Sequence, residues 1–203
     1  MRTCDIEGCE LKHFGNGLCS KHYTQIRRHG KILRRTRLTK NDYILDGNNC
    51  WIKLYDNHGC EVGRTLIDVD DLDRVIKVKW RLSPDGYVRG SQDGMLLSRF
   101  IWREHIPHKF EIDHKDRIKL NNKKSNLRLA TISQNRANRI QKNNTSGFKG
   151  VVWHKKAHKW QSQIKYRSKN RYLGLFTSVK DAARAYNEAA LKYFGEFAVF
   201  NKV

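Results

Sequence analysis

The sequence predicts an α+β, multidomain chain built from several small folded units. Strand-like runs separated by turn signals recur over residues 41–98 and over 145–176. An amphipathic helix pattern follows over 178–195. The first 38 residues are instead rich in cysteine and basic side chains, and a hydrophobic content of 38 % supports folded units of modest size.

Composition divides the chain into four expected segments. A leader (residues 1–38) contains three cysteines and ends in a basic tail, RRHGKILRRTR. A β-rich scaffold (41–98) is followed by a basic, asparagine-rich segment (99–142) and by a C-terminal module (145–203). The stretch QKNNTSG, at 141–147, is the expected flexible joint between the last two. The scaffold should pack on the third segment through four aromatic residues: Trp51, Trp80, Phe100 and Trp102.

The charge of the chain indicates a polyanionic partner. The formal net charge is +21, and a balance this basic is typical of proteins that bind nucleic acid. Residues 99–176 hold 20 basic and 4 acidic side chains and residues 1–40 hold 10 and 3, whereas residues 41–98 hold 7 and 10. No basic helix with a broad apolar face is found, which argues against a membrane surface as the partner. We therefore expect nucleic acid to contact residues 99–176 and the leader.

The N-terminus and the cysteines indicate the compartment. No run of about 18 apolar residues exists, so no membrane span is expected. The first residues, MRTCDIEGCE, lack the apolar core of a secretion signal, and a cytoplasmic protein is therefore expected. Five cysteines, an odd number in a reducing compartment, argue against a disulfide framework.

The leader contains a candidate zinc site. Tetrahedral zinc accepts a set of three cysteines and one histidine, and the spacing here offers such a set: Cys4, Cys9, Cys19 and His22. The leader has too few apolar residues to fold alone, so metal binding would supply its folding energy. His13 is a rival ligand, and free thiols in a basic tail are the alternative. Cys50 and Cys60, in the scaffold, are interpreted as ordinary small core residues.

Residues 111–139 contain the candidate catalytic chemistry. Asp113 and His114 follow an apolar residue, and a turn-rich stretch leads to the strand-like SNLRLAT and then to SQNRANR, which has helical composition. This order predicts a hairpin followed by a helix, with Asn135 and Asn138 on neighbouring helical faces. A neutral histidine can activate water near pH 7. Carboxylate and amide oxygens suit a hard divalent cation that would neutralise the phosphate and stabilise the leaving group. The alternative is that these polar residues only form turns.

This segment resembles the HNH nucleases, and among them the His-Asn-Asn branch found in phage and intron-encoded homing endonucleases. The family pattern runs Asp-His, a loop, Asn-Leu-Arg and a further Asn, which here corresponds to Asp113-His114, Asn126-Leu127-Arg128 and Asn135. The resemblance implies a ββα-metal fold over 99–142, with His114 as the general base. It implies that Asp113 and Asn135 bind magnesium or manganese, and that Asn126 braces the hairpin and orients His114. Asn135 stands where the name-giving families have histidine.

The C-terminal module has the pattern of a three-stranded sheet followed by a helix. Apolar and polar residues alternate over Gly150–His154, Trp160–Tyr166 and Arg171–Phe176. The following SVKDAARAYNEAALKYFG is amphipathic, and Ser178 with Asp181 resembles the start of a capped helix. Its alanines would let the helix lie close to the sheet.

The module resembles the Apetala-type, or ethylene-response-factor, DNA-binding domain. The resemblance covers nearly all of it, with landmarks such as YLGLF and AARAYN. In that family the sheet enters the major groove of DNA, which implies a set of contact residues here: Lys149, Trp153, Lys155, Lys156, Trp160, Gln163, Lys165, Arg171 and Tyr172. Lysine replaces family arginines at Lys149 and Lys165, so base readout should be looser. The alternative for Trp153, Trp160 and Tyr172 is that they form the sheet core.

Three functions fit these features. The first is a site-targeted, homing-type DNA endonuclease acting on double-stranded DNA, with the C-terminal sheet as its targeting element. The others are a non-catalytic DNA-binding regulator and an RNA-directed nuclease. The enzyme is favoured by the presence of Asp113, His114 and Asn135. DNA is favoured over RNA because the expected sheet enters a major groove, which in RNA is too narrow for side chains to read. A phage-encoded protein in a bacterial cytoplasm is expected, and the oligomeric state is left open.

Overall fold

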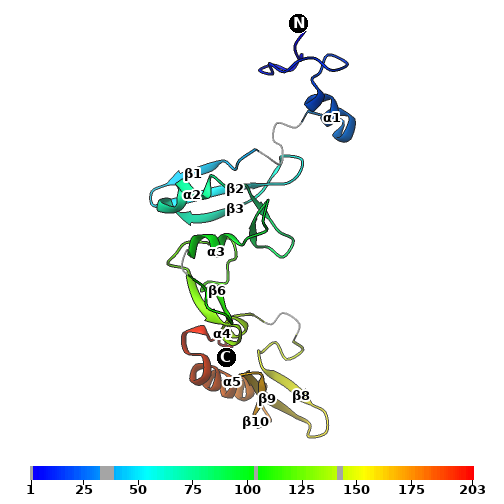
Figure 1. The fold of residues 1–203 in the computed structure, drawn as a ribbon. Helices are drawn as coiled ribbons and strands as arrows, with labels where there is room; N and C mark the ends of the chain where they lie inside the picture. Colours follow the sequence, from blue (N-terminus) through cyan, green and yellow to red (C-terminus); the bar gives the residue numbers. More distant parts are fainter. Residues whose placement is uncertain (1, 33–38, 103–104, 141–143) are drawn as a thin grey trace.

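A computed structural model of the chain describes residues 2–32, 39–102, 105–140 and 144–203 (Figure 1). It has mixed α and β structure with several small sheets, which confirms the expected class. The last residues of the leader's basic tail and the first residues of the expected joint lie outside the described residues. Within the described ranges, no helix has the length and apolar character needed to cross a membrane.

The described part of the leader contains one regular helix. The helix α1 (Ser20–His29) begins directly after Cys19, so the helix presents His22 to the cysteines that precede it. It ends at Gly30, whose φ of 67° is the left-handed conformation that glycine adopts without strain. Basic residues in its last turn complement the negative end of the helix dipole.

The scaffold is a meander with additional short elements. The strands β1 (Tyr43–Asp46), β2 (Asn49–Tyr55) and β3 (Glu61–Asp68) form one antiparallel sheet. The elements that follow are η1 (Val69–Asp71), α2 (Leu72–Val75), β4 (Trp80–Leu82), β5 (Val88–Gly90) and α3 (Leu97–Trp102). Alternate residues of β2 are buried, including Cys50, which has no exposed surface. The expected core role of Cys50 is confirmed, whereas Cys60 is exposed.

The third segment forms a hairpin followed by a short helix. The strands β6 (Phe110–His114) and β7 (Leu127–Thr131) pair antiparallel, and α4 (Ile132–Ala137) follows without a linker. A capping box fixes this junction. The hydroxyl of Thr131 accepts from the backbone N–H of Gln134 (3.2 Å), and the side-chain oxygen of Gln134 accepts from the N–H of Thr131 (2.8 Å).

The C-terminal module has the expected three strands and one helix. The strands β8 (Val151–His154), β9 (Lys159–Tyr166) and β10 (Lys169–Phe176) lie in the order β10-β9-β8, and α5 (Val179–Phe194) packs on them before η2 (Gly195–Phe197). The expected helix cap is confirmed, because the hydroxyl of Ser178 accepts from the N–H of Asp181 (3.4 Å). The alanines of α5 are buried against the sheet.

Two hydrophobic cores meet at the hairpin, which lies between the scaffold and the C-terminal module (Figure 1). The first core joins scaffold residues to Ile112 and Leu127. Trp80, Phe100 and Trp102 belong to it or pack on it as expected, whereas Trp51 lies between two buried positions of β2 and outside this core. The second core joins residues of the third segment to the C-terminal module: Ala130, Ala137, Ile164, Tyr186, Ala189, Ala190, Phe194 and Phe197.

The second core predicts coupled stability. Phe194→Ala removes a ring that is 6 % exposed, and such truncations cost about 3–5 kcal/mol. Because the core is shared, the amides of both β6–β7 and β9 should exchange hydrogen faster in the variant. Leu191→Ala, on the exposed side of the same helix, should change stability by less than about 0.5 kcal/mol. Unchanged protection of β6–β7 in Phe194→Ala would contradict this coupling.

Candidate functional site

The alternation of β6 sends its last two side chains to opposite faces of the hairpin. His114 pairs with Leu127 on the scaffold side, and Asp113 pairs with Arg128 on the side of α4 and the C-terminal module. Both Asp113 and His114 are 5 % exposed. They nevertheless line one cavity of about 540 Å³, together with Asn135 and Asn138 from α4 and its C-terminal end.

His114 is held by an asparagine that the sequence did not single out. The side-chain oxygen of Asn122 lies 3.2 Å from Nε2 of His114. Because an amide oxygen only accepts, Nε2 carries the hydrogen and Nδ1 keeps its lone pair. Asn122 is itself 1 % exposed, and its Nδ2 donates to the hydroxyl of Thr65 (2.9 Å) and to the carbonyl of Lys119 (3.2 Å).

Burial also keeps this histidine neutral. Burial lowers the pKa of His114 below its usual value, and the Asn122 hydrogen bond and nearby carboxylates offset the effect only in part. A neutral imidazole with a free Nδ1 is the form that can accept a proton.

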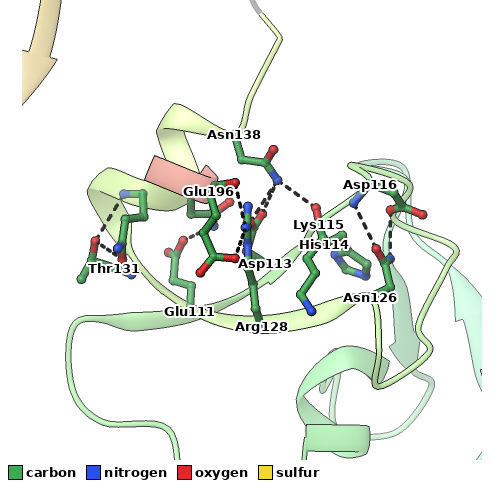
Figure 2. Close-up of polar contacts among 12 residues, drawn as sticks. Glu111, Asp113, His114, Lys115, Asp116, Asn126, Arg128, Thr131, Asn138 and Glu196 are labelled. Atoms are coloured by element: carbon green, nitrogen blue, oxygen red, sulfur yellow. Dashed lines mark hydrogen bonds and ion pairs between the residues drawn. The ribbon is translucent and has the colours of Figure 1, made fainter. Parts of the chain in front are cut away.

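Asp113 is fixed by contacts from two directions (Figure 2). Nδ2 of Asn138 lies 3.0 Å from each carboxylate oxygen and donates to the carbonyl of His114 (2.8 Å). Nε of Arg128 donates to Oδ2 at 2.9 Å. Oδ2 therefore receives two donors and Oδ1 receives one, which leaves Oδ1 the more available of the two.

Arg128 connects this carboxylate to the C-terminal module. Its Nη1 donates to the carbonyl of Glu196 (3.0 Å) and lies 3.3 Å from the Glu196 carboxylate. Its guanidinium also stacks on the ring of Phe197, 3.9 Å from the ring centroid. The module therefore touches the candidate site through one arginine.

Asn135 is oriented by a carboxylate of β6. Its Nδ2 donates to the carboxylate of Glu111. Its side-chain oxygen has no hydrogen-bond partner within the described part of the chain, although the residue lines the cavity. This amide oxygen is therefore available to a ligand.

Asn126 braces the loop between the two strands. Its oxygen accepts from the N–H of Asp116 (3.0 Å), and its Nδ2 donates to the Asp116 carboxylate (2.9 Å) and the Asn121 carbonyl (2.7 Å). The structure thus places Asn126 in the bracing position, while the direct contact with His114 comes from Asn122. Burial acts to raise the pKa of Asp116, but hydrogen bonds from the backbone N–H of Ile118 and from the side chains of Asn121 and Asn126 outweigh it and lower the pKa.

Cations surround the cavity. Arg117, Lys119 and Arg139 line it, and Asp113 is the only carboxylate among its described lining residues. Arg117 and Arg139 are exposed and form no ion pair within the described ranges. Such arginines can bind a phosphate group with two parallel hydrogen bonds.

The donors in the cavity fit a hard divalent cation. A carboxylate oxygen of Asp113 and the amide oxygen of Asn135 are of the type that magnesium and manganese prefer. Magnesium usually keeps several waters and takes the rest of its ligands from substrate phosphates, so two protein oxygens suffice. The surrounding cations would attract that phosphate.

The leader brings its predicted zinc ligands together. The ligand atoms of the four predicted residues lie within 4.8 Å of one another: Cys4, Cys9, Cys19 and His22. Three separations are 3.2 Å (Cys4 Sγ to His22 Nδ1), 3.6 Å (Cys19 Sγ to His22 Nδ1) and 3.9 Å (Cys9 Sγ to Cys19 Sγ). Tetrahedral zinc requires separations of about 3.5–3.8 Å. The rival ligand His13 instead accepts from the N–H of Gly17 (3.1 Å).

The acidity of Cys4 agrees with a metal site. Burial acts to raise the pKa of Cys4, but the hydrogen bond with His22 and bonds from backbone groups outweigh it and bring the pKa to about 6. The thiolate is the form that binds zinc. The set of donors and their spacing therefore fit a structural zinc ion.

The structure places the predicted DNA-contact residues of the C-terminal sheet on different faces of that sheet. Ile164 is buried against α5, so alternate residues of β9 lie on the outer face of the sheet. Gln163, Lys165 and the 62 % exposed Tyr172 are on this outer face. Lys155 and Lys156 are exposed in the turn between β8 and β9.

Other predicted contact residues lie elsewhere. Trp160 packs with the alanines of α5, as the sheet-core alternative expects, and its cross-strand partner Trp153 is 44 % exposed. Arg171 lies on the α5 side, its guanidinium 5.4 Å from the Tyr193 ring centroid. Lys149 donates to the carbonyls of Ala137 and Arg139, and burial lowers the pKa of Lys149 to about 8. Lys149 therefore stabilises the end of α4 in this structure.

Comparison with known proteins identifies the family. The family model described as HNH endonuclease matches residues 96–137, a stretch that includes Asp113, His114 and Asn135. HNH endonuclease L560 of Acanthamoeba polyphaga mimivirus is 36 % identical over 144 residues, which cover 68 % of this chain and 74 % of that protein. The chain therefore belongs to the HNH endonuclease family, a family of nucleases.

Two further relatives match shorter stretches. Protein 3.8 of Escherichia phage T7 is 42 % identical over 60 residues, 29 % of this chain and 50 % of that protein. The AP2-like ethylene-responsive transcription factor TOE2 of Arabidopsis thaliana is 35 % identical over 68 residues, 34 % of this chain and 14 % of that protein. No solved structure gives a significant match.

The cysteine cluster predicts stoichiometric zinc. Purified protein should contain about one zinc per chain by elemental analysis, and Cys4→Ser/Cys9→Ser should lose it and unfold the leader. Cys60→Ser is the matched control, because Cys60 is exposed and outside the cluster. A metal-free protein whose leader is folded, judged by protection of the α1 amides, would rule out this site.

The Asn122 contact predicts a positioning role. Asn122→Ala should lower kcat for DNA cleavage about 100-fold, since small displacements of a catalytic group have effects of that size. Nitrogen NMR of the His114 imidazole should show the Nε2–H tautomer in the wild type and a mixture in the variant. Asn57→Ala, at an exposed turn, is the control. An unchanged tautomer in Asn122→Ala would show that Asn122 does not orient the ring.

Proposed function

We propose that this protein is a site-targeted, homing-type DNA endonuclease that hydrolyses phosphodiester bonds with one divalent metal ion and a histidine general base. The observation that supports this most directly is the neutral His114, fixed beside Asp113 and Asn135 in a cavity lined by cations. A base, two hard oxygen donors and phosphate-binding side chains are the groups that phosphodiester hydrolysis requires.

Each side chain has a defined task in this proposal. His114, with Nε2–H held by Asn122, accepts a proton from the attacking water at Nδ1. Asp113 and Asn135 would hold magnesium or manganese, which supplies Lewis-acid stabilisation of the phosphate and of the leaving oxygen when bound. Asn138 and Arg128 keep the Asp113 carboxylate in place. Asn126 keeps the connecting loop in shape.

Arg117 and Arg139 bind the scissile phosphate in the proposed reaction. Both line the cavity, and neither forms an ion pair within the described residues. Positive side chains placed where negative charge increases in the transition state lower the barrier more than they stabilise the substrate.

The other segments deliver this centre to double-stranded DNA. We propose an Apetala-type DNA-binding domain over 145–203, which contacts DNA through the outer-face residues Gln163, Lys165 and Tyr172. Residues 1–38 form a zinc-stabilised leader, 41–98 a scaffold and 99–142 the ββα-metal nuclease. The similarity to TOE2 and the exposed basic side chains support this division. The viral relatives support a phage-encoded protein that acts in the cytoplasm of its host.

The proposal predicts cleavage of supercoiled plasmid DNA in the presence of magnesium. A single nuclease centre per chain should produce nicked circles first. His114→Ala should lower the rate by about 100-fold or more, which is the usual contribution of general-base catalysis. Asn135→Ala should raise the magnesium concentration needed for half-maximal cleavage, because it removes one proposed ligand.

The control for these variants is His58→Ala, which replaces an exposed histidine outside the cavity. It should cleave at the wild-type rate. If the wild type cleaves plasmid DNA no faster than His114→Ala, the enzyme proposal fails. A non-catalytic DNA-binding regulator then becomes the better interpretation.

A further inference from the structure

The short helix α4 separates the candidate cavity from a larger groove. Asn135 and Asn138, three positions apart, face the cavity that holds Asp113. Ser133 and Arg136, also three positions apart, line a second space of about 940 Å³ on another side of the same helix. We call this second space the α4 groove.

The opposite wall of the α4 groove belongs to the C-terminal module. Outer-face residues of the sheet line it (Gln163, Lys165 and Asn170), together with Ile164, Tyr186 and Phe194 from the α5 side. The groove thus borders the face of the sheet that carries the exposed predicted DNA contacts. A duplex resting on that face is brought against α4.

The lining of the groove is strongly basic. It includes five cationic residues and, among the described residues that line it, no Asp or Glu: Lys109, Arg136, Lys149, Lys165 and Arg167. Lys109 and Arg136 are exposed and form no ion pair within the described ranges, whereas Lys149 is already bound to backbone carbonyls. Cations without an ion-pair partner among the described residues therefore lie where α4 and the C-terminal module face each other. Their charge is complementary to a phosphate backbone.

We propose that the α4 groove holds the sugar–phosphate backbone of the same DNA duplex that the C-terminal sheet contacts. This inference rests on the proposed nuclease function and adds the path of its substrate. Recognition and cleavage then take place on two sides of one helix about 10 Å across, and the cut falls within about half a helical turn of the bases that the sheet reads. Lys109 and Arg136 contact phosphates along this path.

The test is the salt dependence of DNA binding, measured without cleavage. Full-length protein is titrated in buffer without added magnesium or chelator against a DNA duplex of about 30 base pairs, and the slope of log K against log [salt] is determined. Each lost phosphate contact reduces that slope by about 0.9, so Lys109→Gln/Arg136→Gln should reduce it by about 1.8. Glutamine removes the positive charge and keeps an unbranched polar side chain, and hydrogen exchange of β6–β7 checks that the fold is intact.

The matched control is Lys180→Gln/Lys192→Gln. It removes the same charge from exposed positions on α5, outside the groove, and should leave the slope unchanged. Equal losses in the two double variants would overturn the proposal, since net charge alone would then explain them. An RNA duplex of the same length is run in parallel, and a loss confined to RNA would also overturn it.

A failure of the groove proposal can be distinguished from a failure of the proposed nuclease function. If the slope falls as expected but the wild type does not cleave plasmid, the groove binds DNA and the nuclease proposal fails. If the wild type cleaves and the slope does not change, the nuclease proposal holds and the α4 groove is not on the path of the substrate.

Discussion

The buried carboxylate of Asp113 is the constraint on which the arrangement around it depends. A charge that is 5 % exposed needs partners, and removing one partner of a buried ion pair typically costs about 3–5 kcal/mol. Its partners come from two elements, Arg128 on β7 and Asn138 at the end of α4. Arg128 is in turn held by Glu196 and Phe197. The carboxylate is thus correctly placed only when the hairpin, the helix and the C-terminal module are all folded together.

The two faces of the hairpin position different residues of the candidate site. The face carrying His114 belongs to the core of the scaffold, where Asn122 and Thr65 connect the imidazole to β3. The face carrying Asp113 belongs with α4 and the second core. The proposed base is therefore positioned against the scaffold and the carboxylate against α4 and the C-terminal module, although the two residues are adjacent in sequence. The alternation of a β-strand is sufficient to produce this separation.

The features that were predictable from the sequence are local ones. The hairpin with its helix, the three strands followed by α5, and the cysteine–histidine set all follow from residue periodicity and spacing. The partners of Asn122, Arg128 and Asn138 could not be read in the same way. Thr65 lies 57 positions from Asn122 and Glu196 lies 68 positions from Arg128, so only the packing of distant segments brings them together. The face on which Arg171 lies could not be read from the sequence either, because alternation along β10 decides it and β10 contains an irregularity between Tyr172 and Gly174.

The sharing of Ala130 and Ala137 with α5 has a consequence for retargeting such a nuclease. A binding domain attached by a free linker can be exchanged for another by grafting. Here, replacing the C-terminal module would expose Ala130 and Ala137 of the third segment. It would also remove Glu196 and Phe197, the two residues of the module that contact Arg128. If the outer face of β9 and β10 contacts DNA as proposed, new specificity is more accessible through side-chain changes on that face, which leave the α5 side of the sheet intact. The shared core therefore favours a change of specificity by single substitutions over a change by exchange of whole domains.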